Sequence, residues 1–384
     1  MKKFLLSFLL ILLCISLTGC WDRREIGNVT IVLGLAVDAD EKEDQIRMTA
    51  QVANTSTISA ASEKGSGGSG GNAKPYLNLS SSAKTVLPAV RSSVTKSGSK
   101  LYMSHNYVIL FGQSLAERGL GNYMDFFLRD HELRLDMNLL IARGQGADIL
   151  DADTGFQSIP ALHVHDLINA QEQLSTGMTV SVLDFVNRLA AGRSAPLIPI
   201  IEALSEGETQ VLNMGGTAVF DGDRMIGELN EQETRGLLWI TDLVKQAVLV
   251  VPIEEDRVTI EVQRSSGSIS AEEDEDGNIT MVLRVDARGA IGSERGHGNY
   301  TTKDGTDTLL RAFAGEIEGD IRACLDKSRE LSADVFGFSD KIYRHHPTRW
   351  QEMQGEEFYN LPVRIEVKTN LNSSGRIGGP VDVE

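Results

Sequence analysis

The stretch LRAFAGEIEGDIRACL, residues 310–325, carries the clearest structural signal in this chain. Its apolar positions are three, four or one residue apart, which places them on one face of an α-helix: Leu310, Phe313, Ile317, Ile321, Cys324 and Leu325. Strands are predicted around this helix, at residues 246–253, 258–263, 279–285, 287–291 and 361–367. Antiparallel strands packed with one long helix predict an α+β domain over residues 231–384.

The region before this domain predicts a helix and a β-hairpin. Residues 231–245 open with acidic side chains, which suit the positive N-terminus of a helix. Residues 211–220 and 224–229 predict two strands joined across Asp221-Gly222-Asp223, a strong turn signal. A proline-containing connection at 194–199 precedes them. We therefore predict a small middle β domain, or a connection, at residues 191–230.

Residues 20–190 predict one N-terminal α+β domain. Its predicted strands are 29–38, 45–52, 106–111 and 137–141, and its predicted helices are 80–95 (which Pro88 can interrupt), 120–128, 160–174 and 180–189. Residues 56–74 are mostly Ser, Gly and Ala, a composition that predicts a flexible loop. The predicted fold class is α+β, in three mixed domains behind a signal peptide at residues 1–19.

Composition sets outer limits on this protein. The chain has 384 residues, 41% of them hydrophobic and 24% charged, which is ordinary for globular proteins and excludes wholesale disorder. Lys and Arg total 37 against 54 Asp and Glu, a net charge of −17. Because nonspecific nucleic-acid binding needs cations to neutralise phosphates, no nucleic-acid partner is expected.

The first twenty residues predict a bacterial lipoprotein signal. Lys2 and Lys3 precede 14 uncharged residues, 4–17. That length suits a signal-peptide core of roughly 7–15 residues and is short of the about 20 that a membrane-spanning helix needs. The run ends in Leu17-Thr18-Gly19-Cys20, which resembles a lipobox, where the cysteine receives diacylglycerol. The alternatives are an ordinary signal peptide with an accidental cysteine, or an uncleaved anchor.

Cleavage before Cys20 changes the physical state of the chain. It removes 19 of the 384 residues, two of them lysines, so 365 residues remain and the net charge moves from −17 to −19. Such a body is repelled by anionic lipid within a Debye length of about 8–10 Å. We therefore expect attachment to the outer face of the cytoplasmic membrane through acyl chains on Cys20 or through a protein partner. Eight residues, 21–28, precede the first strand and span roughly 30 Å at most.

Three cysteines are too few for a disulfide framework. Cys14 leaves with the signal and Cys20 is the lipidation site. Cys324 lies on the apolar face of the predicted helix, so we expect a buried, unreactive thiol.

No residues make a convincing metal site. The acidic run 272–277 mimics the start of an EF-hand loop, but its twelfth position is Leu283, not a bidentate glutamate, so it predicts a solvated hairpin turn. His163 and His165 lie two positions apart and have no adjacent third ligand, which favours a structural or surface pair. His345-His346 has no identifiable partner ligand.

Catalytic motifs are equally scarce. Asp130-His131-Glu132 predicts a charged surface turn. The chain has no Gly-x-Ser-x-Gly elbow, no Walker loop and no His-Glu-x-x-His. These absences argue against the familiar enzyme classes, and we predict no catalytic residues, metal or cofactor.

The residues after the lipobox, Trp21-Asp22-Arg23-Arg24-Glu25-Ile26, resemble the opening of the Ger(x)C family, the lipoprotein C subunits of spore nutrient-germinant receptors. Similar segments follow in the family's order: Met103-Ser104-His105-Asn106, Gly216 to Phe220, Gly227-Glu228-Leu229, Glu233 to Gly236, Ala333 to Phe338, Pro347 and Trp350. The Ser/Gly-rich loop and the acidic run at 272–276 look like local elaborations. The resemblance implies three domains of mixed α and β structure, with lipid attached at Cys20 and a family signature at Trp21, Asp22, Arg23, Arg24 and Glu25.

The resemblance implies a binding or assembly role with two integral membrane partners, the A and B subunits, at the inner spore membrane. Our leading hypothesis is a non-enzymatic lipoprotein subunit needed for nutrient-triggered germination. An alternative is a solute-binding lipoprotein that captures the germinant in a pocket between domains. A third is a lipid-anchored hydrolase, which requires a clustered nucleophile and base.

Overall fold

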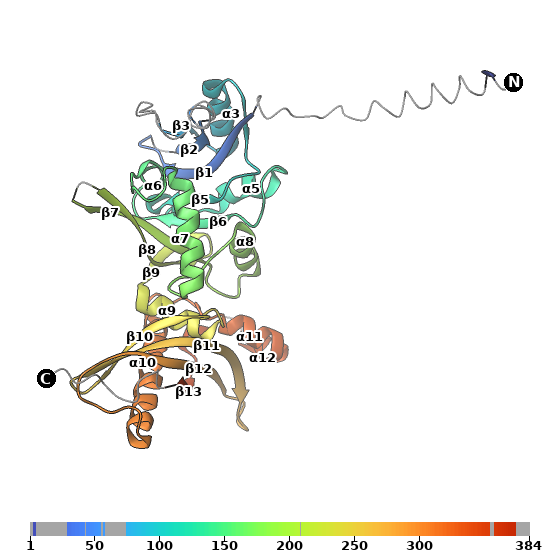
Figure 1. The fold of residues 1–384 in the computed structure, drawn as a ribbon. Helices are drawn as coiled ribbons and strands as arrows, with labels where there is room; N and C mark the ends of the chain where they lie inside the picture. The colour runs from blue at the N-terminus through green and yellow to red at the C-terminus, as the bar shows by residue number, and fades with distance from the viewer. Residues whose placement is uncertain are drawn as a thin grey trace.

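The computed structural model describes residues 29–42, 44–54, 74–207, 209–353 and 357–373, together with residues 3, 4 and 57. These residues form two lobes stacked end to end, each built on one β-sheet (Figure 1). The predicted α+β, multidomain fold class is confirmed. The predicted loop at 56–74 lies outside the described residues except for residues 57 and 74.

The sheet of the N-terminal lobe has the order β3-β2-β1-β5-β6-β7-β8-β9, and β4 pairs with β1. Its strands are β1 (Val29–Ala39), β2 (Ile46–Ala53), β3 (Tyr76–Ala83), β4 (Lys100–Tyr102), β5 (Val108–Gly112), β6 (Asn138–Ala142), β7 (Leu197–Glu206), β8 (Thr209–Asp221) and β9 (Arg224–Leu229). Strands β1, β5, β6 and β7 pair in parallel, and the other pairs except β1–β4 are antiparallel.

Helices cover both faces of the central strands. The N-terminal lobe contains α3 (Val86–Ser97), α4 (Gln113–Ala116), α5 (Gly121–Arg129), α6 (Gly146–Asp151), α7 (Pro160–Leu174) and α8 (Val182–Ala191). Along β5, Leu110 packs in the cluster with α6 and α7, whereas Ile109 and Phe111 pack in the cluster with α3, α5 and α8. This alternation explains why β5 is buried along its whole length.

The prediction of a helix at residues 80–95 is wrong over its first residues. Residues 80–83 belong to strand β3, not to the predicted helix, which begins at Val86. The serines of this edge strand are satisfied by neighbours: Ser81 Oγ donates to the Ala89 carbonyl at 2.7 Å, and Ser80 Oγ lies 2.9 Å from Thr49 Oγ1. Pro88 does not interrupt α3, because in the first turn of a helix its missing N–H costs no hydrogen bond.

The predicted connection at 194–199 runs instead into strand β7, where Pro199 pairs with Thr217 of β8. Residues 191–230 therefore contribute strands to the N-terminal sheet. The join to that sheet is narrow, because β6 and β7 share only the pairs Ile141–Ile200 and Ala142–Ile201. The division into three domains stays a prediction.

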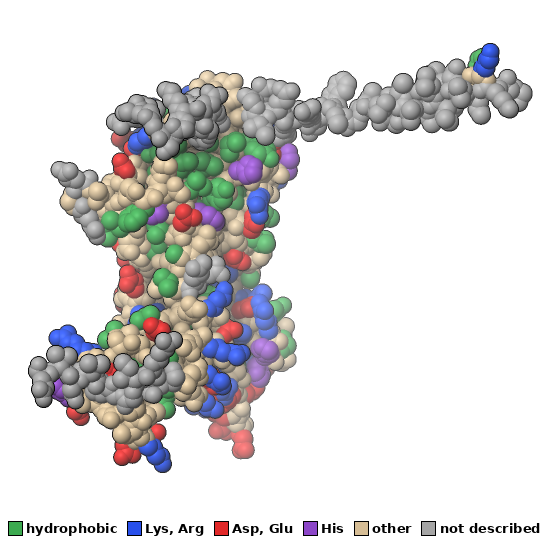
Figure 2. Space-filling view, in the orientation of Figure 1, with side chains coloured by type: hydrophobic (Ala, Val, Ile, Leu, Met, Phe, Trp, Pro, Cys, Tyr) green, Lys and Arg blue, Asp and Glu red, His purple; other side chains and the backbone are tan. Residues whose placement is uncertain are grey.

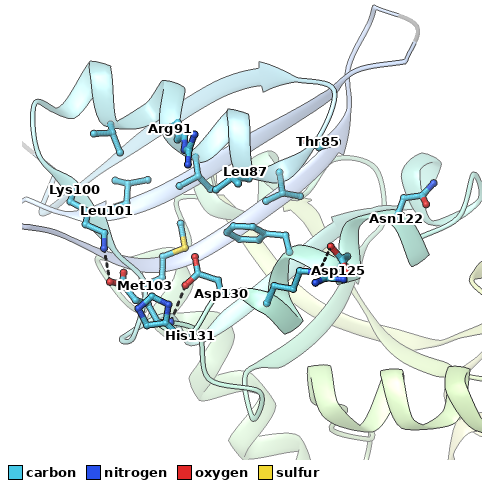
Figure 3. A pocket seen from close by; sticks show the side chains of 16 residues that line it. Thr85, Leu87, Arg91, Lys100, Leu101, Met103, Asn122, Asp125, Asp130 and His131 are labelled. Carbon is cyan, nitrogen blue, oxygen red and sulfur yellow. Dashed lines mark hydrogen bonds and ion pairs between the residues drawn. The ribbon is translucent and has the colours of Figure 1, made fainter.

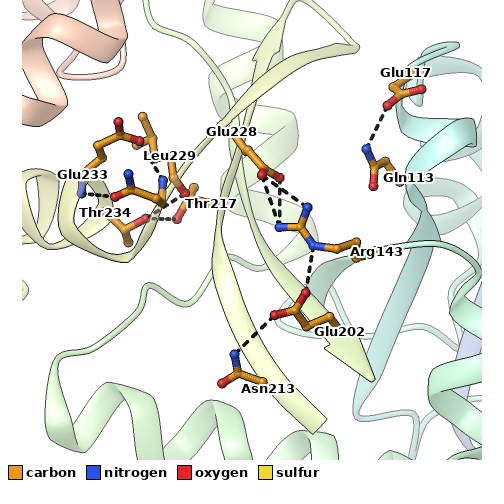
Figure 4. A network of polar contacts seen from close by, with 11 residues as sticks. Gln113, Glu117, Arg143, Glu202, Asn213, Thr217, Glu228, Leu229, Glu233 and Thr234 are labelled. Atoms are coloured by element: carbon orange, nitrogen blue, oxygen red, sulfur yellow. Dashed lines mark hydrogen bonds and ion pairs between the residues drawn. The ribbon is translucent and has the colours of Figure 1, made fainter. Parts of the chain in front are cut away.

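A polar network reinforces this narrow join (Figure 4). Arg143, which follows β6, places its Nε 2.9 Å from Glu202 of β7 and its Nη2 3.2 Å from Glu228 of β9. Asn213 of β8 donates to Glu202 at 3.3 Å. One guanidinium thus ties together strands that share few backbone hydrogen bonds.

The C-terminal lobe is a four-stranded sheet packed against helices. Its elements are α9 (Glu231–Ile240), β10 (Ala247–Ile253), β11 (Asp256–Glu273), β12 (Ile279–Arg295), α10 (Lys303–Glu330), α11 (Phe338–His345), α12 (Pro347–Glu352), a 3₁₀ turn η2 (Phe358–Asn360) and β13 (Val363–Ser373). The sheet order is β10-β11-β12-β13. The two strands predicted at 279–285 and 287–291 form one continuous strand, β12.

The predicted amphipathic helix at residues 310–325 lies within α10, and its buried face is confirmed with one correction. Leu309, not Leu310, joins Phe313, Ile317, Ile321 and Cys324 in the core. The residue that the apolar pattern passed over is Asp320, which is 1% exposed on the same face. A buried acid there requires a partner.

Candidate functional site

The predicted anchor residues Cys20, Trp21, Asp22, Arg23, Arg24 and Glu25 lie outside the described residues. The first described strand, β1, begins at Val29, which pairs with Lys100 of β4. Strand β1 lies inside the sheet, between β2 and β5. Within the described part of the chain, none of the helices is both long and apolar enough for a membrane span.

A groove with a cavity of about 700 Å³ lies between α3 and α5, beside β4 (Figure 3). We call it the α3–α5 groove. It is lined by apolar side chains of α3, α5, β4 and the following turn, among them Val90, Val94, Leu101, Met103 and Phe126. Leu87 is 44% exposed at its edge. In the face seen in Figure 2, hydrophobic side chains gather on the N-terminal lobe and most Lys and Arg on the C-terminal lobe.

The charged rim of the α3–α5 groove is largely paired within itself. Lys100 Nζ lies 2.5 Å from Glu132 Oε1, and Arg129 Nε lies 2.7 Å from Asp125 Oδ1. Asp130 Oδ1 accepts the backbone N–H of Glu132 at 2.9 Å. The predicted surface turn Asp130-His131-Glu132 is confirmed, and it forms part of this rim.

A second candidate region is the joint between the lobes, where the family-like segments meet. Asp320 of α10 binds both a guanidinium and an indole of α9: Arg235 Nε at 2.6 Å, Arg235 Nη2 at 2.8 Å and Trp239 Nε1 at 3.1 Å. The bidentate hydrogen bond to Asp320 raises the pKa of Arg235. Thr234 Oγ1 donates to Thr217 Oγ1 of β8 at 3.1 Å, which connects α9 to the N-terminal sheet.

Glycines allow these elements to approach one another closely. A Cβ atom on Gly236 of α9 would lie 2.1 Å from the Asp320 carbonyl oxygen and 3.1 Å from Cys324 Cβ. On Gly216 of β8, where φ is +105°, it would lie 2.2 Å from the Leu229 carbonyl oxygen. At both positions an added Cβ atom would collide with a backbone carbonyl oxygen. Glycine is therefore needed there for close packing, and not only for its backbone conformation.

Asp334 holds the segment after α10 in place through hydrogen bonds to backbone N–H groups. Its carboxylate accepts the N–H of Phe338 at 2.9 Å and of Ser339 at 2.8 Å, at the start of α11. Its own carbonyl accepts the N–H of Ala195 across the joint at 2.9 Å. Burial raises the pKa of the Asp334 carboxyl to about 6, although backbone N–H donors oppose that shift.

Because of Asp334, we expect the free energy of unfolding to depend on pH. Because its folded pKa lies above the unfolded value of 3.8, its protonation stabilises the folded state fully below about pH 4, and this stability is lost as the pH rises through about 6. The wild-type chain should therefore gain up to about 3 kcal/mol relative to Asp334→Asn between pH 7 and pH 4. Denaturant unfolding of both proteins at several pH values measures this difference. A constant difference would contradict it.

A cavity of about 500 Å³ also lies at the joint, lined by residues of both lobes that include Arg188, Phe220, Asp334, Trp350 and Tyr359. Burial lowers the pKa of Arg188, which donates from Nη1 to the Ala195 carbonyl at 3.3 Å. This is the kind of cavity that the solute-binding alternative requires.

The remaining sequence candidates are structural. His163 and His165 both lie on α7 but have different partners: His163 Nδ1 lies 2.8 Å from Thr154 Oγ1, and the ring of His165 packs on Tyr107. Cys324 is fully buried, as predicted, and burial raises the pKa of its thiol.

The acidic run forms the predicted hairpin turn, in which Asp274 Oδ1 accepts the N–H of Asp276 and of Asn278. His345 ends α11, and His346 lies 3.7 Å from Glu273. No group of three or more His, Cys, Asp or Glu residues suited to a metal ion occurs among the described residues.

Sequence reasoning missed both the α3–α5 groove and Asp320. Two signals could have found them. Val86, Val90 and Val94 recur every four residues, which is one helical face. Asp320 falls three residues after Ile317 and four before Cys324, in the middle of an apolar face.

Comparisons with known proteins agree with this arrangement. The model of the spore germination protein N-terminal domain matches residues 22–203, and that of the spore germination B3/GerAC-like C-terminal region matches residues 215–375. Spore germination protein KC of Bacillus subtilis strain 168 is 24% identical over 403 residues, covering 99% of this chain and 98% of that protein. Spore germination protein B3 of the same strain is 25% identical over 392 residues, covering 98% and 99%.

The crystal structure of the GerBC protein shares the fold. Its TM-score with this chain is 0.57 at 20% sequence identity, covering 88% of this chain and 97% of that one. The two family models and the two full-length relatives indicate the same family, and the fold match agrees with them. The chain belongs to the Ger(x)C family of spore germination proteins, the non-enzymatic C subunits of germinant receptors.

Proposed function

We propose that this chain is a lipid-anchored germinant-receptor subunit, attached through Cys20 to the outer face of the inner spore membrane and assembled there with integral membrane A and B subunits. The resemblance to the Ger(x)C family supports this location. The observation that carries the proposal is the lipobox-like Leu17-Thr18-Gly19-Cys20, eight residues before the folded body begins at Val29. A tether of that length keeps the body within roughly 30 Å of the bilayer.

The test is Cys20→Ala, with Cys324→Ala as the matched control. Cys20→Ala removes the acyl acceptor and should release the chain from the membrane fraction, abolish labelling by a fatty-acid precursor and impair nutrient-triggered germination. Cys324→Ala removes the buried thiol and should leave all three unchanged. Two acyl chains are enough for stable attachment, so the loss should be nearly complete. Full membrane binding and normal germination of Cys20→Ala spores would show that the anchor lies elsewhere.

Solute capture at the joint is a second candidate function, favoured by the cavity of about 500 Å³ between the lobes. Calorimetry of the full chain in detergent against amino acids and sugars would separate it from a purely assembling role. Absence of a binding heat would count against it.

A further inference from the structure

The α3–α5 groove is an apolar surface that the fold leaves open. Val86, Val90 and Val94 of α3 recur at one-turn spacing along one wall, and Phe126 of α5 stands on the other. Figure 3 shows Leu101 and Met103 between these walls. Leu87, at the edge, is 44% exposed. The spacing of the three valines on α3 matches the spacing at which another helix presents apolar side chains along one of its faces.

The position of the groove relates it to the tether. Lys100 and Leu101 of β4 line the groove and pair with Val29 and Thr30, the first residues of β1. In Figure 1 the start of β1 lies next to α3. Residues 20–28, which precede β1 after the predicted cleavage, thus join the body at this groove, and Cys20 lies no more than roughly 30 Å of chain away.

The charges around the groove indicate an uncharged occupant. Lys100 is paired with Glu132, and Arg129 with Asp125. The two other Arg, Lys, Asp or Glu residues that line the groove are Arg91 and Asp130, so three cations face three anions and their formal charges balance. A ligand with a strong charge would find little uncompensated charge in the rim. Apolar side chains also line the groove, among them Leu101 and Met103, each 3% exposed.

We propose that the α3–α5 groove docks an apolar helical face of an integral membrane subunit, at the point where that subunit emerges from the bilayer. The proposal rests on the proposed function, because it uses the anchor at Cys20 to place the groove near the membrane. A helical face in water gains free energy on burial in the groove. An acyl chain gains almost none, because it already lies in hydrocarbon as apolar as the groove.

The experiment places a photo-crosslinking amino acid at Leu87 and, as matched control, at Leu183 of α8, which is also 44% exposed. Irradiation of intact spores should give an adduct from position 87 to an integral membrane subunit of the receptor and none from position 183. In parallel, Leu87→Glu should weaken co-purification of that subunit roughly tenfold, since a charge would enter an apolar contact. Leu183→Glu should not change it.

Other outcomes overturn the inference. An adduct from position 87 to lipid, to residues 21–28 of the same chain or to a second copy would assign the groove another occupant. No adduct, in spores whose wild-type chain fractionates with the membrane, would refute the groove while leaving the anchor intact. The anchor prediction itself is tested separately, by the membrane fractionation of Cys20→Ala.

Discussion

Replacing Asp320 with alanine is expected to cost about 3–5 kcal/mol of unfolding free energy, the usual effect of breaking a buried ion pair from one side. Asp320 is 1% exposed and receives three hydrogen bonds from α9, two from Arg235 and one from Trp239. Alanine would leave a guanidinium and an indole N–H without their acceptor. The loss is a large share of the roughly 5–15 kcal/mol that stabilises a typical domain.

Denaturant unfolding of the full chain measures this, with Glu318→Ala as control. Glu318 lies on the same helix and pairs with Arg322 four residues on, but its side chain is 40% exposed. Its removal should cost only about 0.3–0.5 kcal/mol. Asp320→Asn keeps the shape and part of the hydrogen bonding, so it should lie between the two. Equal effects of Asp320→Ala and Glu318→Ala would mean that the buried pair does not stabilise the packing of α9 on α10.

Gly236→Ala is expected to destabilise the chain by about 1–3 kcal/mol, because α9 and α10 must separate to admit one methyl group. The added Cβ would meet the Asp320 carbonyl at 2.1 Å, and backbone cannot move aside as a flexible side chain would. Alanine is the better helix former by about 1 kcal/mol, so the contact has to outweigh that gain.

Gly315→Ala supplies the opposite expectation within α10. A Cβ there would have no neighbour within 4 Å, so only the helix propensity changes. The variant should be stabilised by roughly 0.5–1 kcal/mol. Thermal and denaturant unfolding of the two variants should therefore shift in opposite directions. If both variants were stabilised, the close packing of α9 on α10 would be refuted.

These glycines show what could be predicted from sequence. Gly236 and Gly315 both interrupt helical patterns, and only the packing of α9 on α10 tells them apart. Elements with strong local signals were predicted well: α7 spans residues 160–174 as expected, and the β8–β9 hairpin forms across Asp221-Gly222-Asp223. Strands β3 and β7 were missed, because Ser80–Ala83 and Pro199 are poor strand formers that pairing partners hold in place.

The candidate sites were less predictable than the fold. The α3–α5 groove is formed by residues up to 47 positions apart, from Thr85 to Glu132, so it exists only once α3, β4 and α5 have packed together. Asp320 breaks an apolar pattern, which marks it as unusual, but Arg235 lies 85 residues earlier and no local rule connects them. The periodicity of apolar residues predicts which face of a helix is buried. It does not predict which polar side chain pairs with a charged residue on that face.

The placement of β1 has a mechanical consequence. The strand at which the tether enters is held by β2 on one side and by β4 and β5 on the other. A pull on its N-terminus acts along the strand, so hydrogen bonds on both sides would be sheared together and not opened one by one. An edge strand such as β3 would peel away under much smaller force. Under the proposed attachment through Cys20, a pull from the membrane would load both sides of β1 at once, and we expect this strand to stay in the sheet.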